Sequence, residues 1–403
     1  MKEEPLKQVS SVSQAQVTGT AEDRNGQFHR AFTPRQIHMI SLGTAMGSGI
    51  FITIGQALST GGPGSMLLAY ALVCSCAWAV LYTLCEMVVA FPVSGNFVDY
   101  ADRWVDQSVA FGAGFSVWLS YTAVISSEAV FLNILIQYWA DQRLPEAASL
   151  TIMLVLLSII FVCPVKVFAH FEYFTSMVKL ILFVFLIAIC VAMIGGAGKT
   201  GQVHHGSTWT DLPAFKNGFS GFVKCAMLAV WGIGDQIPVT TMGGEAQHVR
   251  YSLAHASKLV PVRISIVFLL SISMISILVP SDDDRLMGGS GATASPYVIA
   301  MNDAGIPVIP HIVNATILIG VIGNAAVAMY TASRILRAMA HQALIPEFFA
   351  RVDSQGRPRV ALLITGTIGT LLTYINLSGM FASHPMIQHT HGLTDDQLPA
   401  WRH

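Results

Sequence analysis

The segment Gly43-Thr44-Ala45-Met46-Gly47-Ser48-Gly49-Ile50-Phe51 interrupts an apolar run that is otherwise long enough to span a membrane. Its glycines disfavour a continuous helix, since each costs about 1 kcal/mol of helix propensity relative to alanine. Inside a bilayer, unwound backbone is tolerated only where it is buried in protein or lines a cavity. The freed N–H and C=O groups can then bind a small polar ligand, as in discontinuous-helix transporters. The segment therefore predicts a solute carrier.

Composition indicates an all-α integral membrane protein. Of the 403 residues, 53% are hydrophobic and 11% are charged, whereas roughly 25% are charged in soluble domains. Apolar runs predict about nine spanning segments. These are Ile37–Ile54, Ser65–Phe91, Val109–Trp139, Leu150–Val165, Phe174–Ile194, Phe219–Met242, Val262–Val279, Ile309–Ser333 and Val360–Ser378. The net charge of −1 and the lack of a basic stripe argue against a nucleic-acid partner.

The chain divides into a membrane domain over residues 35–378 and two polar ends. Residues 1–34 lack an apolar signal-peptide core and are expected to form a disordered cytosolic tail. Residues 379–403 form a polar, His-containing tail. Lys and Arg concentrate in the loops that are internal when the N-terminus is cytosolic, which the positive-inside rule favours. We expect a multi-pass protein of the plasma membrane.

The sequence predicts neither an enzyme nor a cofactor or metal site. The six cysteines lie within or at the ends of apolar segments, which favours buried thiols over a disulfide or metal site. No nucleophile–base pair, metal-ligand spacing or phosphate-binding loop is visible.

Short motifs follow one another in a fixed order along residues 35–380. They are Gly47-Ser48-Gly49-Ile50-Phe51, Gly61-Gly62-Pro63-Gly64-Ser65, Phe91-Pro92-Val93-Ser94-Gly95-Asn96-Phe97, Phe171-Glu172-Tyr173-Phe174, Gly244-Glu245-Ala246, Ala294-Ser295-Pro296-Tyr297 and Tyr330-Thr331-Ala332-Ser333-Arg334. This set resembles the amino acid permeases, in particular the fungal branch of the amino acid–polyamine–organocation superfamily. The resemblance implies two inverted five-helix repeats with the substrate between broken helices 1 and 6.

A second break in the sixth span supports that symmetry. The segment Trp231-Gly232-Ile233-Gly234-Asp235-Gln236-Ile237-Pro238 lies at the position equivalent to the first break. Paired interruptions of this kind are the best sequence indication of a carrier's binding site. The alternative is two ordinary helix kinks.

The two breaks supply the candidate substrate-binding residues. Backbone N–H groups near Ser48–Ile50 suit a carboxylate, because they begin a half-helix. Carbonyls near Gly43–Ala45 and Trp231–Gly234 would face an ammonium group, although the glycines can instead serve close helix packing. The complete set is Gly43, Thr44, Gly47, Ser48, Gly49, Ile50, Glu128, Trp231, Gly232, Gly234 and Asp235.

Lys179 and Glu128 are the proton-coupling candidates. A cation within a span is costly and is a functional hypothesis by default. In relatives with this fold a lysine at the place of Lys179 can occupy the position of a coupling sodium ion, whereas snorkelling to the surface is the alternative. Glu128 has a counterpart in fungal relatives and is expected to contact substrate, bind a proton or brace the site. Trp231 is either a gate or a packed core residue.

Departures from the family pattern leave the substrate open. Asp235-Gln236-Ile237 replaces a usual Gly-Thr-Glu, and Ala325 and Ala326 lie where relatives tend to have Asn and Ser. Glu86 and Glu245 are expected to organise cytosolic loops with Arg103, Arg250 or Arg334.

The apolar spans finish near Ser378, so the second repeat is expected to be incomplete. The resemblance implies proton-coupled import of amino acids, with protons and the lipid bilayer as the other partners. The alternatives are an amino acid sensor without flux and a non-functional truncated permease.

Overall fold

Every expected span contains a helix in the computed structural model, which describes residues 32–47, 49–91, 97–140, 143–199, 201, 203–233, 237–246, 249–288, 295–306 and 308–377. The main helices are α2 (Pro34–Ala45), η1 (Gly49–Thr53), α3 (Ile54–Ala90), α4 (Phe97–Trp104), α5 (Gln107–Ala140), α6 (Glu146–Val162), α7 (Val165–Ile194), α9 (Gly218–Ile233), α10 (Ile237–Gly244), α11 (Val249–Leu278), α14 (Ile309–His341) and α15 (Arg359–Leu377). Short helices in the connections are α8 (Ser207–Thr210), α12 (Arg285–Gly288), α13 (Pro296–Asp303) and η3 (Glu347–Ala350).

Six of the described helical segments are long and apolar enough to cross a membrane. They are α3, α5, α7, α14, the segment Gly218–Met242 and the segment Lys258–Leu278 of α11. Two shorter apolar helices, Glu146–Val162 and Arg359–Ile375, accompany them. The described part of the chain is therefore all-helical, with the long apolar helices of a multi-pass membrane protein.

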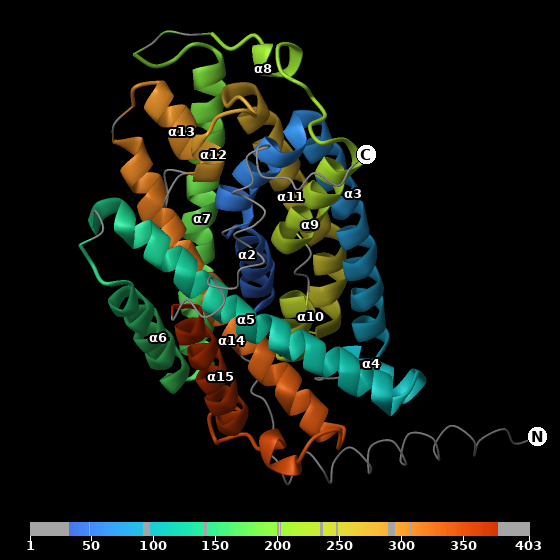
Figure 1. Ribbon diagram of the computed structural model, residues 1–403. Helices are drawn as coiled ribbons and strands as arrows, with labels where there is room; N and C mark the ends of the chain where they lie inside the picture. Colours follow the sequence, from blue (N-terminus) through green and yellow to red (C-terminus); the bar gives the residue numbers. More distant parts are fainter. Residues whose placement is uncertain are drawn as a thin grey trace, which may run out of the picture.

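The first span is broken at the predicted place. Thr33 caps α2 in a reciprocal capping box with Gln36, which fixes where the helix begins. The helix ends at Ala45, and a single π-helical turn, η1, leads into α3. At Gly62 the backbone turns with φ of +76°, a conformation that favours glycine, and the rest of α3 runs back down the molecule (Figure 1). The structure thus divides the first span into two half-helices, one ending at Ala45 and the other beginning at Gly49. We call α2, η1 and the start of α3 broken helix 1.

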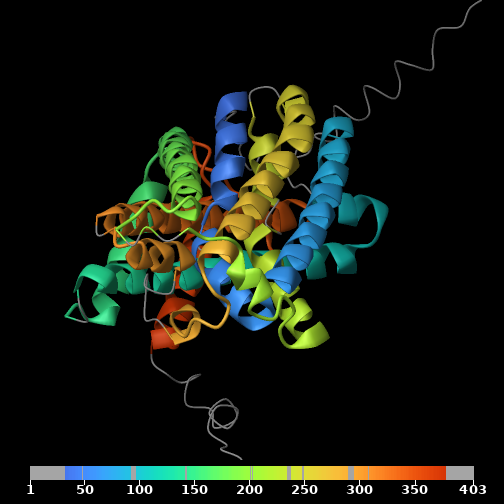
Figure 2. The ribbon, with the colours of Figure 1, turned by 90° about the horizontal axis from the view of Figure 1, so that it is seen from above.

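The helices form two packed groups. Helix α3 packs along α9 and α11, and α11 also contacts α2 and α10. In the other group α14 packs along α5, α7 and α15, and α5 contacts α6 and α15. Figure 2 shows α2, α11 and α3 next to one another, with α5 and α14 running across them. The two groups meet where α2 contacts α7 and α14, so a site between the broken helices lies at their junction.

The loop between η3 and α15 is held by a charged clamp centred on Asp353. Its carboxylate accepts hydrogen bonds from the backbone and Nε of Arg357, at 2.8 and 2.9 Å, and from Nε of Arg359 at 2.8 Å. Burial acts to raise the pKa of Asp353, but the backbone and side-chain hydrogen bonds outweigh it and lower the pKa to about 2. The clamp fixes the end of the molecule where α15 begins.

Replacing Asp353 by asparagine is expected to lower the free energy of unfolding by about 1 kcal/mol, because charged hydrogen bonds are lost from a partly screened site. The folded-state pKa lies below the ordinary value of 3.8, so this stability is present above about pH 4. It is lost as the pH falls toward 2. Thermal unfolding of the detergent-solubilised chain between pH 7 and pH 2 measures the effect. Asp284→Asn, an exposed aspartate at the opposite end, is the control; equal losses for both variants would contradict the clamp.

Candidate functional site

The sixth span consists of α9, which continues through Ile233, and α10; residues 234–236 between them lie outside the described residues. We call α9 and α10 together broken helix 6, after the break that the sequence predicts. A cavity of about 490 Å³ lies where the two broken helices face α5 and α14. Its size is within the range of about 300–1,000 Å³ typical of small-molecule sites. We call it the central cavity. Its lining residues are Thr44, Ala45, Gly47, Gly49, Val117, Ser120, Tyr121, Val124, Glu128, Met227, Val230, Trp231, Gly232, Ile237, Asn324, Val327 and Ala328.

The glycines at the breaks are required by close approach. A Cβ atom on Gly49 would lie 2.7 Å from the Cα of Gly232, so the two broken helices touch backbone to backbone. A Cβ atom on Gly47 would lie 1.7 Å from Nδ2 of Asn324 on α14. The close approach supports the packing interpretation of these glycines, and Gly47 and Gly49 also line the cavity. Ligand contact by these glycines stays a prediction.

Gly49→Ala is expected to reduce stability by about 1–3 kcal/mol, the usual cost of overpacking, and to abolish uptake. The neighbouring atom belongs to backbone, so relief requires the two broken helices to separate. Gly112→Ala on α5 is the matched control, since a Cβ atom there has nothing within 4 Å. Thermal unfolding and uptake by surface-expressed variants measure both effects. Equal behaviour of the two alanine variants would refute the close approach.

Lys179 joins the break in helix 1 to the cavity. Its Nζ donates to the carbonyl oxygen of Gly43 at 2.9 Å and to Oδ1 of Asn324 at 3.1 Å. On the other side of the amide, Nδ2 of Asn324 donates to Oε1 of Glu128 at 3.5 Å. Oε1 of Glu172 lies 3.8 Å from Nζ of Lys179. Lys179 is only 1% exposed, so its amine does not snorkel to the membrane surface.

Two polar residues of this network, Asn324 and Glu172, were not among the predicted site residues. Asn324 directly precedes Ala325 and Ala326, the region where the family resemblance leads one to expect Asn and Ser. The asparagine was therefore sought one residue too far along the chain. Glu172 lies seven residues before Lys179, two turns away on the same face of α7, and is 0% exposed. An intramembrane carboxylate at that spacing from a lysine was the signal that could have found it.

Several predicted contacts are engaged within the protein. The carbonyl oxygen of Gly43 accepts a hydrogen bond from Lys179, so this carbonyl already has a donor within the protein. The expectation of a free Ile50 amide is wrong, because its N–H donates to the Gly47 carbonyl at 3.2 Å and its side chain is buried. Trp231, in the last turn of α9, is 45% exposed and lines the cavity, which excludes the packed-core interpretation. Ser48, Gly234 and Asp235 lie outside the described residues.

A buried cluster of aromatic and charged side chains lies at the start of α2. Nε of Arg334 donates to Oε1 of Glu245 at 3.0 Å, which confirms the expected pairing of that glutamate. The guanidinium of Arg334 lies 3.8 Å from the ring centroid of Tyr330. Tyr330 stacks on Phe168, and Phe32 packs edge-on against both rings. The cluster joins the start of α2 to α7, α14 and the end of α10.

Known proteins resemble this chain in sequence. The family model described as amino acid permease matches residues 36–383. Amino-acid permease GAP3 of Candida albicans is 34% identical over 349 residues, 87% of this chain and 58% of the relative. S-adenosylmethionine permease GAP4 of Candida albicans is 35% identical over 85% of this chain and 56% of its own length. General amino-acid permease GAP1 of Saccharomyces cerevisiae is 33% identical over 84% of this chain and 57% of its own length. The chain thus spans little more than half the length of these relatives.

Two solved transporter structures share the fold. Mhp1, a nucleobase-cation-symport-1 family transporter, superposes with a TM-score of 0.56 at 15% identity, covering 86% of this chain and 73% of its own. A Na⁺-coupled sialic acid symporter gives a TM-score of 0.59 at 12% identity, covering 90% of this chain and 78% of its own. The expected all-helical inverted-repeat transporter fold is confirmed. On the match of residues 36–383 and the identity to these permeases, the chain belongs to the amino acid permease family.

Proposed function

We propose that this polypeptide imports amino acids with protons, by alternating access around the central cavity, in a plasma membrane with its N-terminus in the cytosol. The observation that carries the proposal is the meeting of the two broken helices at a cavity walled by Glu128, Asn324 and Trp231. Broken backbone at membrane depth is tolerated where it lines such a cavity.

The cavity offers separate surroundings for the two charged groups of an amino acid. The half-helix that begins near Gly49 directs the positive end of its dipole toward the cavity, which suits the carboxylate. Glu128 is 2% exposed and lines the cavity, so its carboxylate suits the α-ammonium group. Val117, Val124 and Met227 supply an apolar wall for the side chain.

Lys179 supplies the proton coupling. Its hydrogen bond to Gly43 ties α7 to broken helix 1, and its bond to Asn324 is relayed to Glu128 in the cavity. The charged amine strengthens both bonds, because charge-assisted hydrogen bonds are stronger than neutral ones. Loss of the proton therefore loosens the end of α2 that borders the cavity. In this mechanism proton binding favours the closed inner cluster around Glu245 and Arg334, and proton release favours its opening.

The test is uptake by cells that lack their own amino acid permeases. A surface-localised version of the chain is expected to accumulate at least one radiolabelled amino acid, faster at pH 5 than at pH 7. The Gly49→Ala variant serves as the inactive control. Binding of an amino acid by the purified chain without uptake would replace transport with a sensor function. The absence of both uptake and binding for every amino acid would overturn the proposal.

A further inference from the structure

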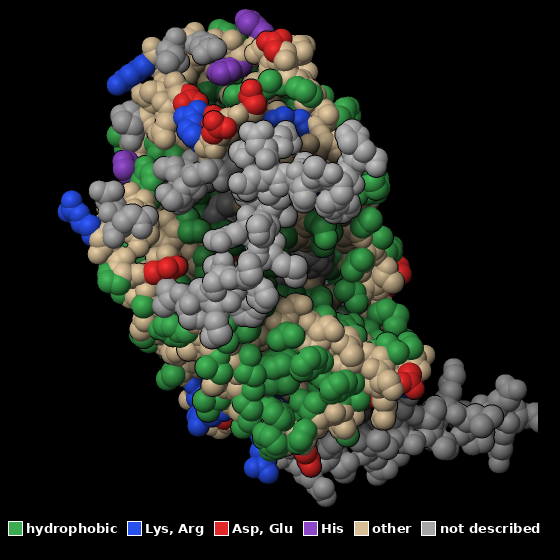
Figure 3. All heavy atoms as spheres, in the orientation of Figure 1, with side chains coloured by type: hydrophobic (Ala, Val, Ile, Leu, Met, Phe, Trp, Pro, Cys, Tyr) green, Lys and Arg blue, Asp and Glu red, His purple; other side chains and the backbone are tan. Residues whose placement is uncertain are grey.

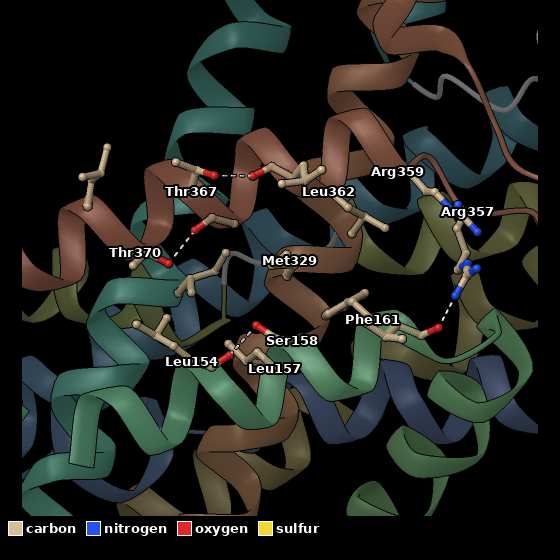
Figure 4. A pocket seen from close by; sticks show the side chains of 15 residues that line it. Leu154, Leu157, Ser158, Phe161, Met329, Arg357, Arg359, Leu362, Thr367 and Thr370 are labelled. Atoms are coloured by element: carbon tan, nitrogen blue, oxygen red, sulfur yellow. Dashed lines mark hydrogen bonds between the residues drawn. The ribbon is translucent and has the colours of Figure 1, made fainter. Parts of the chain in front are cut away.

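A second cavity also borders α5 and α14 but shares no lining residue with the central cavity. It has a volume of about 790 Å³ and runs between α6 and α15, with α5 and α14 at its base (Figure 4). Leu154 and Phe161 of α6 and Leu363 and Leu371 of α15 line it, and Met329 of α14 lies at its base. We call it the α6–α15 groove.

The walls of the groove present hydrocarbon even where their side chains carry hydroxyl groups. Ser158 donates to the carbonyl of Leu154 at 2.8 Å. Thr367 and Thr370 donate in the same way to the carbonyls of Leu363 and Gly366, at 2.8 and 2.7 Å. Each hydroxyl proton is thus used within its own helix, as the dashed lines of Figure 4 show. A polar solute gains little from these walls, whereas an aliphatic chain fits them.

One end of the groove is positively charged. Arg357 and Arg359 line it there, and both donate to the single carboxylate of Asp353. Arg357 also donates to the carbonyl of Val162 and so ties the end of α6 to the groove. The side chain of Arg359 is 66% exposed. The two guanidinium groups of Arg357 and Arg359 carry one more charge than the Asp353 carboxylate neutralises, so the mouth of the groove has a net positive charge.

The length of the groove matches one leaflet of a bilayer. From Arg359 to Leu371, α15 rises about 18 Å at 1.5 Å per residue, against about 15 Å for half of the hydrocarbon core. Leu363 and Leu371 are 70% and 57% exposed along this length. Figure 3 shows hydrophobic side chains gathered over the lower part of the molecule, with Lys and Arg at its lower edge. The groove therefore has an apolar trough one leaflet long and a cationic end.

We propose that the α6–α15 groove binds one anionic phospholipid, with an acyl chain in the trough and the phosphate at Arg359 and Arg357. The positive-inside distribution puts these arginines at the cytosolic face, where anionic lipids concentrate. Basic pockets between membrane helices on that side bind such headgroups. A polypeptide segment as occupant fits less well, because an apolar helix gives the two arginines no anion. This inference uses the proposed orientation of the chain but does not depend on transport of an amino acid.

The test is native mass spectrometry of the full chain, delipidated in detergent and titrated with phosphatidylserine or phosphatidylcholine. We expect phosphatidylserine to bind more tightly than phosphatidylcholine. Arg359→Gln is expected to weaken phosphatidylserine about fivefold, from about 1 kcal/mol per basic residue near a membrane, and to leave phosphatidylcholine unchanged. Arg351→Gln, an exposed arginine of the same loop outside the groove, is the matched control. Equal affinity for the two lipids, or equal effects of the two arginine variants, would overturn the proposal.

A second variant tests the trough. Thr367 is exposed and lines the groove, so Thr367→Trp fills it without disturbing the core. We expect this variant to lose bound phosphatidylserine while its thermal unfolding stays close to that of the wild type. Unchanged binding of phosphatidylserine by Thr367→Trp would contradict lipid binding in the trough.

Discussion

Lys179→Met is expected to abolish proton-driven accumulation of amino acid. Methionine keeps the apolar stem but removes the amine that donates to Gly43 and Asn324. Each buried acceptor left without a donor costs about 1–3 kcal/mol, so both the end of α2 and the Asn324–Glu128 contact loosen. The variant is expected to exchange amino acid down its gradient, with no dependence on pH between 5 and 7.

The measurement is radiolabelled uptake at several external pH values, normalised to the amount of protein at the cell surface. Lys258→Met is the control, because Lys258 on α11 is exposed and makes no part of the site. Wild-type pH dependence in Lys179→Met would mean that Lys179 has only a structural role. Wild-type accumulation in the same variant would remove Lys179 from the mechanism altogether.

Arg334→Gln is expected to destabilise the protein by about 3–5 kcal/mol, the cost of leaving one partner of a buried ion pair alone. Arg334 and Glu245 are 3% and 2% exposed, and the arginine also covers the Tyr330 ring. Loss of the pair separates the end of α10 from α14, so uptake is expected to fall to background.

Thermal unfolding in detergent measures the change in stability, and the Glu245→Gln/Arg334→Gln double variant completes a thermodynamic cycle. The double variant is expected to be more stable than Arg334→Gln, because no lone charge remains buried. Arg285→Gln is the control: Arg285 pairs with Asp283 and Asp303 but is 48% exposed, so its loss is expected to cost at most about 1 kcal/mol. Equal shifts for the Arg334 and Arg285 variants would show that the Glu245–Arg334 pair has no special role.

Much of the fold followed from local pattern. Long apolar runs can only be helices in a bilayer, so the spans were predictable, and clustered glycines marked the break in the first span. The ends of the helices were harder to predict. Helix α14 continues to His341, well past the expected end at Ser333, because its last turns are polar but pack within the protein. A run of hydropathy ends where polar residues begin, whereas a helix ends where its backbone is capped.

The site was only partly predictable, because its residues meet through contacts between distant parts of the sequence. The sequence marked Gly47, Gly49 and Gly232 as backbone breaks, but not that Gly49 and Gly232 would touch. It marked Lys179 as unusual, but its partners Gly43 and Asn324 are 136 and 145 residues away. The α6–α15 groove left no sign in the sequence, because its walls come from four helices with ordinary membrane composition.

Binding of an amino acid in the central cavity between the broken helices is tested by protection of a cysteine placed there. Thr44→Cys lies in the cavity wall at the end of α2, and Asp284→Cys, at an exposed loop position, serves as the reference. The measurement is the rate of modification of each thiol by N-ethylmaleimide as the concentration of a transported amino acid rises. Binding in the cavity predicts that modification of the thiol introduced by Thr44→Cys slows over the concentration range that saturates uptake, while the thiol introduced by Asp284→Cys reacts at a constant rate. An unchanged rate for the thiol introduced by Thr44→Cys under saturating amino acid would contradict it.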